Sequence, residues 1–170
     1  MDLIFLVGYR GSGKTTVARL LAGKLGWSWA DADDVLERQC ARSIRQVFTE
    51  EGEAGFRERE VAVLCELARL NKHVVATGGG VVLRPENRTN LQAGKVVWLT
   101  AAAEVLWQRL GGDASTAGRR PDLTRGGLAE IEELLEVRVP LYAACADWTV
   151  DTAVKSPEEV ADLIYQWFRK

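Results

Sequence analysis

Apolar stretches of strand length alternate along this chain with segments in which apolar residues recur at helical spacing. The stretches expected to form strands are residues 3–7, 27–30, 73–77, 95–100 and 147–151. The segments expected to form helices are residues 14–25, 35–40, 44–48, 55–70, 102–110 and 128–137, with one more at the C-terminus. Apolar strands separated by helices are typical of parallel sheets with both faces covered. We therefore expect an α/β fold, a three-layer sandwich around a five-stranded parallel sheet.

The start of the last helix carries a clear capping signal. Ser156 suits the N-cap, Pro157 suits the first helical position, and Glu159 completes a capping box. Apolar residues then recur on one face of the helix, which indicates that this face packs against the sheet.

Length and composition limit the classes of protein to which this chain can belong. A chain of 170 residues predicts one domain, residues 1–170, and the net charge of −2 argues against a nucleic-acid partner. No apolar run approaches a membrane span and no export signal is visible, so we expect a cytoplasmic protein without a membrane partner. The three cysteines form no CxxC pair and are expected to be reduced, helix-packed thiols. With a single histidine, a Cys/His metal site is excluded, and His73, which enters a predicted buried strand, is interpreted as a strand-edge residue rather than as the centre of a catalytic triad.

One stretch lacks the periodicity of a regular element. Residues 111–127 are rich in glycine and arginine and have little apolar patterning. Such a loop in a compact domain is usually functional or disordered. We interpret it as a mobile lid.

The clearest chemical signal is a phosphate-binding loop. Residues 8–15, Gly-Tyr-Arg-Gly-Ser-Gly-Lys-Thr, match GxxxxGK followed by Thr, between a predicted strand and a predicted helix. The glycines turn backbone N–H groups toward phosphate oxygens, Lys14 would reach the outer phosphates, and Thr15 would hold Mg²⁺. The alternative is a glycine-rich turn with a chance lysine. The guanine-reading sequence of GTPases is missing, since Asn71-Lys72 lacks the aspartate, and the short chain favours a kinase for a small acceptor.

Two further groups follow predicted strands, where ligands of parallel sheets bind. Asp31, Asp33 and Asp34 could hold Mg²⁺ through water and accept a hydrogen bond from the hydroxyl that is phosphorylated. The alternative is a helix N-cap with acids favoured by the helix dipole, which accounts best for Asp34. Residues 78–80 are three glycines, which would let the backbone approach a ligand closely.

Together these motifs resemble the shikimate kinases, P-loop small-molecule kinases of the nucleoside-monophosphate-kinase-like group. The resemblance runs through nearly the whole chain, and its order and spacing are specific. Its marks are the P-loop, Asp31-x-Asp33, Arg42-Ser43-Ile44, Phe56-Arg57 with Glu60, Gly78-Gly79-Gly80, Arg120-Pro121 and Arg138-Val139-Pro140-Leu141-Tyr142. The resemblance implies that ATP, with Mg²⁺, phosphorylates the 3-hydroxyl of shikimate.

The same resemblance implies roles for individual residues. Lys14, Asp33 and Arg120 would be catalytic, and Thr15 and Asp31 would hold Mg²⁺. The substrate would be bound by Asp33, Arg57, Gly79 and Arg138. The residues expected at ATP are Gly11, Ser12, Gly13, Lys14, Thr15, Thr16, Arg109, Arg120 and Pro157.

Some alternatives stay open at this point. Arg119 could replace Arg120 as the lid arginine, and Arg10 could contact the phosphates or only solvent. Glu130 and its neighbours Glu132, Glu133 and Glu136 are interpreted as the solvent-exposed face of a helix. A gluconate-type sugar-acid kinase and a nucleotide-binding regulator without catalysis are the competing functions. The chain is expected to act on ATP and shikimate as a monomer.

Overall fold

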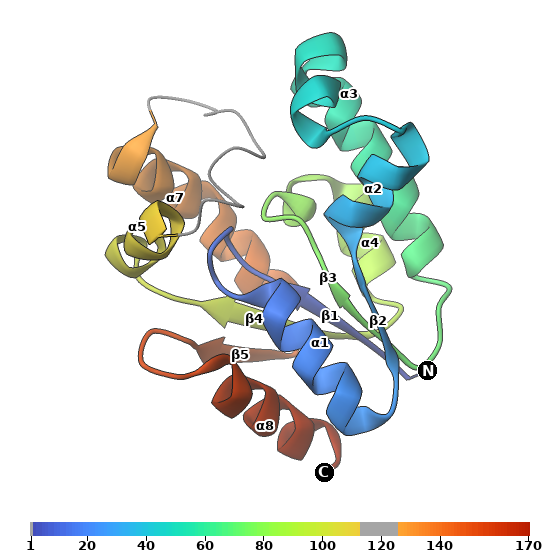
Figure 1. The fold of residues 1–170 in the computed structure, drawn as a ribbon, viewed down its shortest axis with the longest axis vertical. Helices are drawn as coiled ribbons and strands as arrows, with labels where there is room; N and C mark the ends of the chain where they lie inside the picture. The colour runs from blue at the N-terminus through green and yellow to red at the C-terminus, as the bar shows by residue number, and fades with distance from the viewer. Residues whose placement is uncertain (1, 113–125) are drawn as a thin grey trace.

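The expected sheet is present in the computed structural model, which describes residues 2–112 and 126–170 (Figure 1). Its five strands are all parallel and lie in the order β2-β3-β1-β4-β5. The strands are β1 (Leu3–Val7), β2 (Ser28–Asp31), β3 (His73–Ala76), β4 (Lys95–Thr100) and β5 (Trp148–Asp151). β1 is central and wholly buried, as its continuous apolar run predicted, because helices cover both of its faces.

Alternate residues of β1 enter two separate cores. Ile4 and Leu6 pack with α1 (Lys14–Leu25) and α8 (Pro157–Phe168), which lie side by side. Leu3, Phe5 and Val7 pack on the other face. The helices of that face are α2 (Ala32–Cys40), α3 (Ile44–Leu67), α4 (Pro85–Leu91) and α7 (Gly127–Cys145). The three-layer α/β sandwich is therefore confirmed (Figure 1).

The signal at the last helix is also confirmed. Ser156 is the N-cap of α8, its side chain accepts from the backbone N–H of Glu159, and Glu159 returns a bond to the Ser156 N–H. The three cysteines are free thiols, one each on α2, α3 and α7, as expected.

The two helices expected at 44–48 and 55–70 correspond to the two parts of α3, which is interrupted by non-helical backbone at Gly52, where φ is 71°. The expected end of the helix predicted at 128–137 was wrong. α7 does not end at residue 137 but continues through Pro140 to Cys145. Tertiary packing outweighs the proline there, because Tyr142 is fully buried and stacks on Trp98 with ring centroids 5.6 Å apart.

The structure also contains two elements that were not predicted. A 3-10 turn, η1 (Val81–Leu83), leads into α4. α4 has only seven residues, of which Asn87 and Leu91 are buried, so it is too short to show a helical period.

The interpretation of residues 111–127 as a lid concerns a segment that lies mostly outside the described residues. Gly111 and Gly112 end α5 (Ala103–Gly112), and Gly126 and Gly127 lead into α7. Within the described ranges, none of the helices combines the length and the hydropathy needed to cross a membrane.

Candidate functional site

The P-loop joins the carboxyl end of β1 to the amino end of α1. Gly11 and Gly13 have φ values of 82° and 90°, and Gly8 has a φ of 143°. A Cβ at Gly8 would also overlap the carbonyl oxygen of Leu99 on neighbouring β4. Glycine is therefore required at these positions by backbone conformation. The turn presents the first N–H groups of α1, an arrangement that binds anions.

Lys14 bends back over this loop. Its Nζ donates to the carbonyl oxygens of Gly8 at 2.7 Å and Tyr9 at 2.9 Å, and lies 3.5 Å from the Ser12 hydroxyl. The side chain is buried, so its charge is held inside the concavity of the loop. A phosphate bound by the loop would meet this ammonium directly.

Asp31 connects the P-loop helix to the next strand. Its Oδ2 accepts from the Thr15 hydroxyl at 2.6 Å, and its Oδ1 accepts from the backbone N–H groups of Asp33 and Asp34 at 2.9 and 3.3 Å. Asp31, rather than Asp34, is therefore the N-cap of α2. Asp34 is instead an acid in the first turn, where the helix dipole favours it. Burial raises the pKa of Asp31, although the Thr15 hydrogen bond opposes the shift.

Asp33 lies beside Asp31, half-buried in the first turn of α2. β2 pairs with β3 so that Asp31 is opposite Ala76. The acidic turn and the glycines that follow β3 therefore leave the sheet at the same edge, on adjacent strands. This edge also holds the P-loop, because β3 pairs with β1 on its other side.

Arg57, on α3, is buried against the triple-glycine loop. Its Nη1 donates to Glu60 at 2.9 Å and its Nη2 to Glu53 at 3.4 Å. A Cβ at Gly80 would overlap both terminal nitrogens of Arg57, while the φ of Gly80, −99°, suits any residue. The expected reason for glycine at this position was ligand approach. The structure shows that Gly80 makes room for the Arg57 guanidinium.

Arg138, on α7, reaches the same loop from the other side. Its guanidinium lies 5.5 Å from the centre of the Tyr9 ring, and its positive charge acts to lower the pKa of the Tyr142 hydroxyl. A Cβ built on Gly79 would be 3.5 Å from its Nη1. Tyr142 donates to the Gly79 carbonyl, and burial raises the pKa of Tyr142 to about 12. Arg138 is only 5% exposed, and within residues 2–112 and 126–170 no carboxylate forms an ion pair with it.

Arg109, on α5, joins the P-loop to the segment that precedes α8. Its guanidinium donates to the hydroxyl of Thr152 at 2.9 Å and to its carbonyl oxygen at 2.6 Å, and Nη1 is 3.4 Å from the Gly11 carbonyl oxygen. Pro157 begins α8 a few residues later and is exposed. Thr16 is also exposed, in the first turn of α1.

The interpretation of Glu130 as part of a solvent-exposed helix face was wrong. Glu130 is 1% exposed, accepts from the Gly126 N–H at 3.0 Å and lies 3.6 Å from Nη2 of Arg10. Arg10 is thus paired with α7, which neither of its two expected roles foresaw. Glu132 and Glu136 are exposed as expected. The predicted lid arginines, residues 119 and 120, lie outside the described residues.

Sequence reasoning also missed Tyr9 as a contact of Arg138. Tyr9 occupies one of the unspecified positions of the P-loop pattern, so the motif itself carries no signal for it. Its aromatic character was the only available hint.

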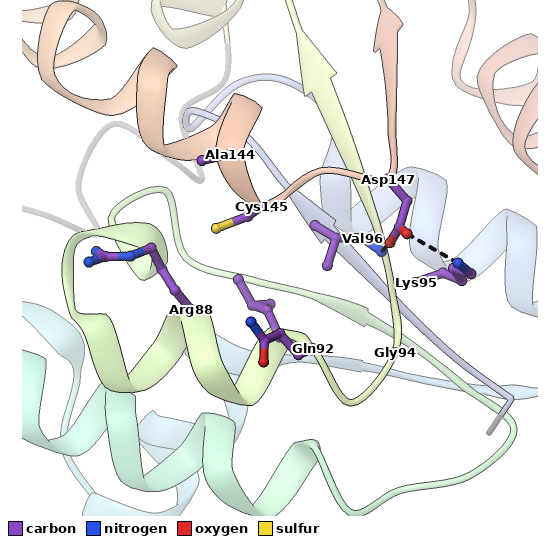
Figure 2. A pocket seen from close by; sticks show the side chains of 9 residues that line it. Arg88, Gln92, Gly94, Lys95, Val96, Ala144, Cys145 and Asp147 are labelled. Carbon is purple, nitrogen blue, oxygen red and sulfur yellow. Dashed lines mark hydrogen bonds and ion pairs between the residues drawn. The ribbon is translucent and has the colours of Figure 1, made fainter.

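A cavity of about 480 Å³ lies elsewhere, beside the amino end of β4 (Figure 2). Several of its polar groups bond one another or the backbone. Lys95 pairs with Asp147 at 3.1 Å, Asp147 accepts from the Val96 N–H at 2.8 Å, and Arg88 donates to the Val82 carbonyl at 2.8 Å. Because the P-loop is at the carboxyl end of the strands, this cavity is not part of the phosphate site.

Comparisons with known proteins find relatives over nearly the whole chain. The family model described as shikimate kinase matches residues 10–169. A shikimate kinase of Rhodopirellula baltica is 46% identical over 159 residues, covering 92% of this chain and 85% of the relative. The structure of shikimate kinase from Acinetobacter baumannii in complex with shikimate superposes with a TM-score of 0.92 and 38% identity, covering 99% of this chain and 93% of that one. The structure of shikimate kinase from Bacteroides thetaiotaomicron has a TM-score of 0.87 and 31% identity, with 99% of both chains covered. The P-loop, the acidic turn after β2 and the two buried arginines thus occur in a chain that belongs to the shikimate kinase family.

Proposed function

We propose that this protein transfers the γ-phosphoryl group of ATP to the 3-hydroxyl of shikimate, giving shikimate 3-phosphate and ADP. The observation that carries the proposal is the buried guanidinium of Arg138, which has no carboxylate partner in the described part of the chain. A buried charge is costly unless it is paired, so the site is built for an anionic ligand. The Acinetobacter relative was solved with shikimate, a ligand that carries one carboxylate.

The acceptor carboxylate is bound by Arg57 and Arg138. Both guanidiniums contact the triple-glycine loop, one at Gly80 and the other at Gly79. Planar guanidinium groups recognise carboxylates by paired hydrogen bonds, which a lysine could not provide. The backbone N–H of Gly79 adds a donor, and the ring of shikimate then places its hydroxyls toward α2.

Asp33 accepts the proton of the attacking hydroxyl and orients it. The first turn of α2 presents this carboxylate at the sheet edge that also holds the P-loop. Phosphoryl transfer requires little more of the protein than positioning and charge neutralisation. Lys14 and the N-terminus of α1 provide that positive charge at the phosphates. Arg109 and Pro157 border the nucleotide on the side of the β5–α8 segment.

The residues present fit a magnesium ion. Asp31 and Thr15 offer oxygen atoms only 2.6 Å apart next to the phosphate loop, and the pKa of Asp31 is raised because its charge is poorly solvated. The described residues contain no cluster of three metal-binding side chains. Magnesium needs none, since it is usually held by one or two carboxylates, water and substrate phosphates. When bound with ATP, the ion neutralises negative charge on the phosphates.

Turnover with chosen acceptors tests the proposal. We expect ADP release that requires both shikimate and Mg²⁺, with shikimate 3-phosphate identified by phosphorus NMR. Gluconate is the control acceptor, because it is the substrate expected of the competing sugar-acid kinase class. ATP hydrolysis measured without any acceptor gives the background ATPase rate. Equal turnover with gluconate, or none with shikimate, would contradict the proposal.

Replacing Asp31 by Asn should separate metal binding from folding. Asparagine still caps a helix, but it weakens the metal site, and we expect the Mg²⁺ needed for half-maximal rate to rise about 10- to 100-fold. The raised pKa means that the folded state binds this proton more tightly than the unfolded state. The wild-type stability contribution of Asp31 is therefore full below its ordinary pKa of 3.8 and is lost as pH rises through the raised value.

The Asp31→Asn variant has no titrating carboxyl at this position. Without metal, its Tm at pH 7 should therefore equal or exceed that of the wild type. Thermal unfolding from pH 3 to 8 and Mg²⁺ titrations of the rate measure the two effects. A lower Tm at pH 7 with unchanged Mg²⁺ dependence would show that Asp31 is only structural.

Replacing Gly80 by Ala should displace the Arg57 guanidinium without straining the backbone. A misplaced substrate-binding group can cost on the order of 10- to 100-fold, and we expect an increase of that size in the KM for shikimate. The KM for ATP should change little. Gly23→Ala on α1 is the control, because a Cβ there meets nothing within 4 Å. An unchanged KM for shikimate in Gly80→Ala would remove Arg57 from the acceptor site.

A further inference from the structure

Tyr9 occupies an unusual place, between the phosphate loop and the arginine of the acceptor site. It is 2% exposed, and its ring packs with Leu106, Leu110 and Ile131 in a small cluster between α5 and α7. Its carbonyl oxygen accepts from Nζ of Lys14 at 2.9 Å and from the Ser12 N–H at 3.2 Å. The backbone of Tyr9 therefore belongs to the phosphate site.

The ring of Tyr9 is contacted by two guanidiniums, that of Arg138 and, at 6.0 Å from the centroid, that of Arg10. Arg138 lies over the ring with its Cζ 5.5 Å from the centroid, within the range of a cation–π contact. The charge of Arg138 also acts on the Tyr142 hydroxyl, which donates to the Gly79 carbonyl. The Nε of Arg138 is buried without a hydrogen-bond partner in the described part of the chain. Among the described residues, the Tyr9 ring is thus the side-chain contact that orients this guanidinium.

We propose that Tyr9 is a positioning residue for acceptor binding: its aromatic face seats the Arg138 guanidinium so that the terminal nitrogens meet the carboxylate of the acceptor. This inference rests on the proposed function, in which Arg138 binds that carboxylate. The residue thereby determines affinity for an anionic acceptor from within the phosphate loop. In this role the Tyr9 side chain touches neither the transferred phosphate nor the reacting hydroxyl.

The ring, and not the hydroxyl, provides the effect. The Tyr9 hydroxyl is buried and has no hydrogen-bond partner in the described residues, so it adds no contact that orients Arg138. Phenylalanine keeps an aromatic face, whereas leucine keeps apolar volume without one. These two substitutions separate the cation–π contact from simple packing.

The first experiment is steady-state kinetics of Tyr9→Leu and Tyr9→Phe with shikimate and ATP varied in turn. A desolvated cation–π contact corresponds to about 3- to 30-fold in affinity, and Tyr9→Leu should raise the KM for shikimate by that factor. Its kcat and its KM for ATP should stay within about twofold, and Tyr9→Phe should restore the KM for shikimate. If Tyr9→Phe and Tyr9→Leu behave alike, or if the KM for ATP rises equally, the proposal is overturned.

A matched control lies on α8. Arg169 is 5.4 Å over the ring of Tyr165, a similar pair far from the P-loop, so Tyr165→Leu should leave the KM for shikimate unchanged. If Tyr9→Leu does not fold, phenylalanines with increasing fluorination at position 9 keep the shape but weaken the ring quadrupole. The KM for shikimate should then rise with each fluorine, and a flat series would refute the contact.

Repeating Tyr9→Leu in an Arg138→Met background distinguishes this inference from the proposed function. If Tyr9 acts through Arg138, the second substitution adds no further loss of shikimate affinity. Full additivity would disprove the positioning role while leaving Arg138 as the carboxylate ligand. If Arg138→Met alone leaves shikimate affinity intact, it is the proposed acceptor site that fails.

Discussion

Asp33→Asn is expected to lower kcat by about 100- to 10,000-fold, the range typical of a general base. Asparagine keeps the shape of the side chain but removes the charge and the proton acceptor. ATP should still bind, because Lys14 and the P-loop are untouched, and nucleotide titration calorimetry checks this directly. Rapid-quench measurement of the chemical step then assigns the loss to phosphoryl transfer rather than to product release.

Asp34→Asn is the matched control, since Asp34 lies in the same first turn of α2 and interacts with the dipole of that helix. Its kcat should change little. If Asp33→Asn kept a near-normal kcat, the proton acceptor would have to be sought at Asp31 or Asp34. A large loss in both variants would instead indicate that the negative charge of the whole turn matters.

Arg138→Met should weaken shikimate binding by about 2–5 kcal/mol, which is roughly a 30- to 5,000-fold increase in Kd. The physical reason is that the carboxylate would lose a buried charge partner. The same substitution removes a buried cation that has no carboxylate partner in the described ranges, so the Tm of the free protein should not fall. Calorimetry of shikimate binding and thermal unfolding without ligand measure the two effects.

Arg57→Met offers the contrast. It also removes a carboxylate ligand, but Arg57 is paired with buried Glu60 at 2.9 Å, and breaking such a pair destabilises a fold by about 3–5 kcal/mol. We therefore expect Arg57→Met to lose both shikimate affinity and Tm, and Arg138→Met to lose affinity alone. If Arg138→Met weakened ATP binding but left shikimate binding intact, Arg138 would belong to the nucleotide site and not to the acceptor site.

Local patterns in the sequence determined much of this protein. Continuous apolar runs predicted the buried parallel strands, and the residue types at 8–15 predicted a phosphate loop between β1 and α1. The capping box at Ser156 was readable because every partner lies within one helical turn. Such features depend on neighbours in the chain, so their physics is present in the order of residues itself. Arg57 and Arg138 were named in advance only through family resemblance, because no local rule distinguishes them from other helical arginines.

Tertiary structure alone decided the features in which distant segments meet. Glu130 fitted a solvent-facing position by helical period, but it is buried and pairs with Arg10 of the distant P-loop. Gly80 has an ordinary φ, and only the packing of Arg57 explains its missing side chain. Tyr9 and Arg138 are far apart in the sequence, and only the folded chain brings the Arg138 guanidinium over the Tyr9 ring. Pairing of buried charges and rings over long sequence separations follows from three-dimensional packing, which periodicity and motif spacing do not encode.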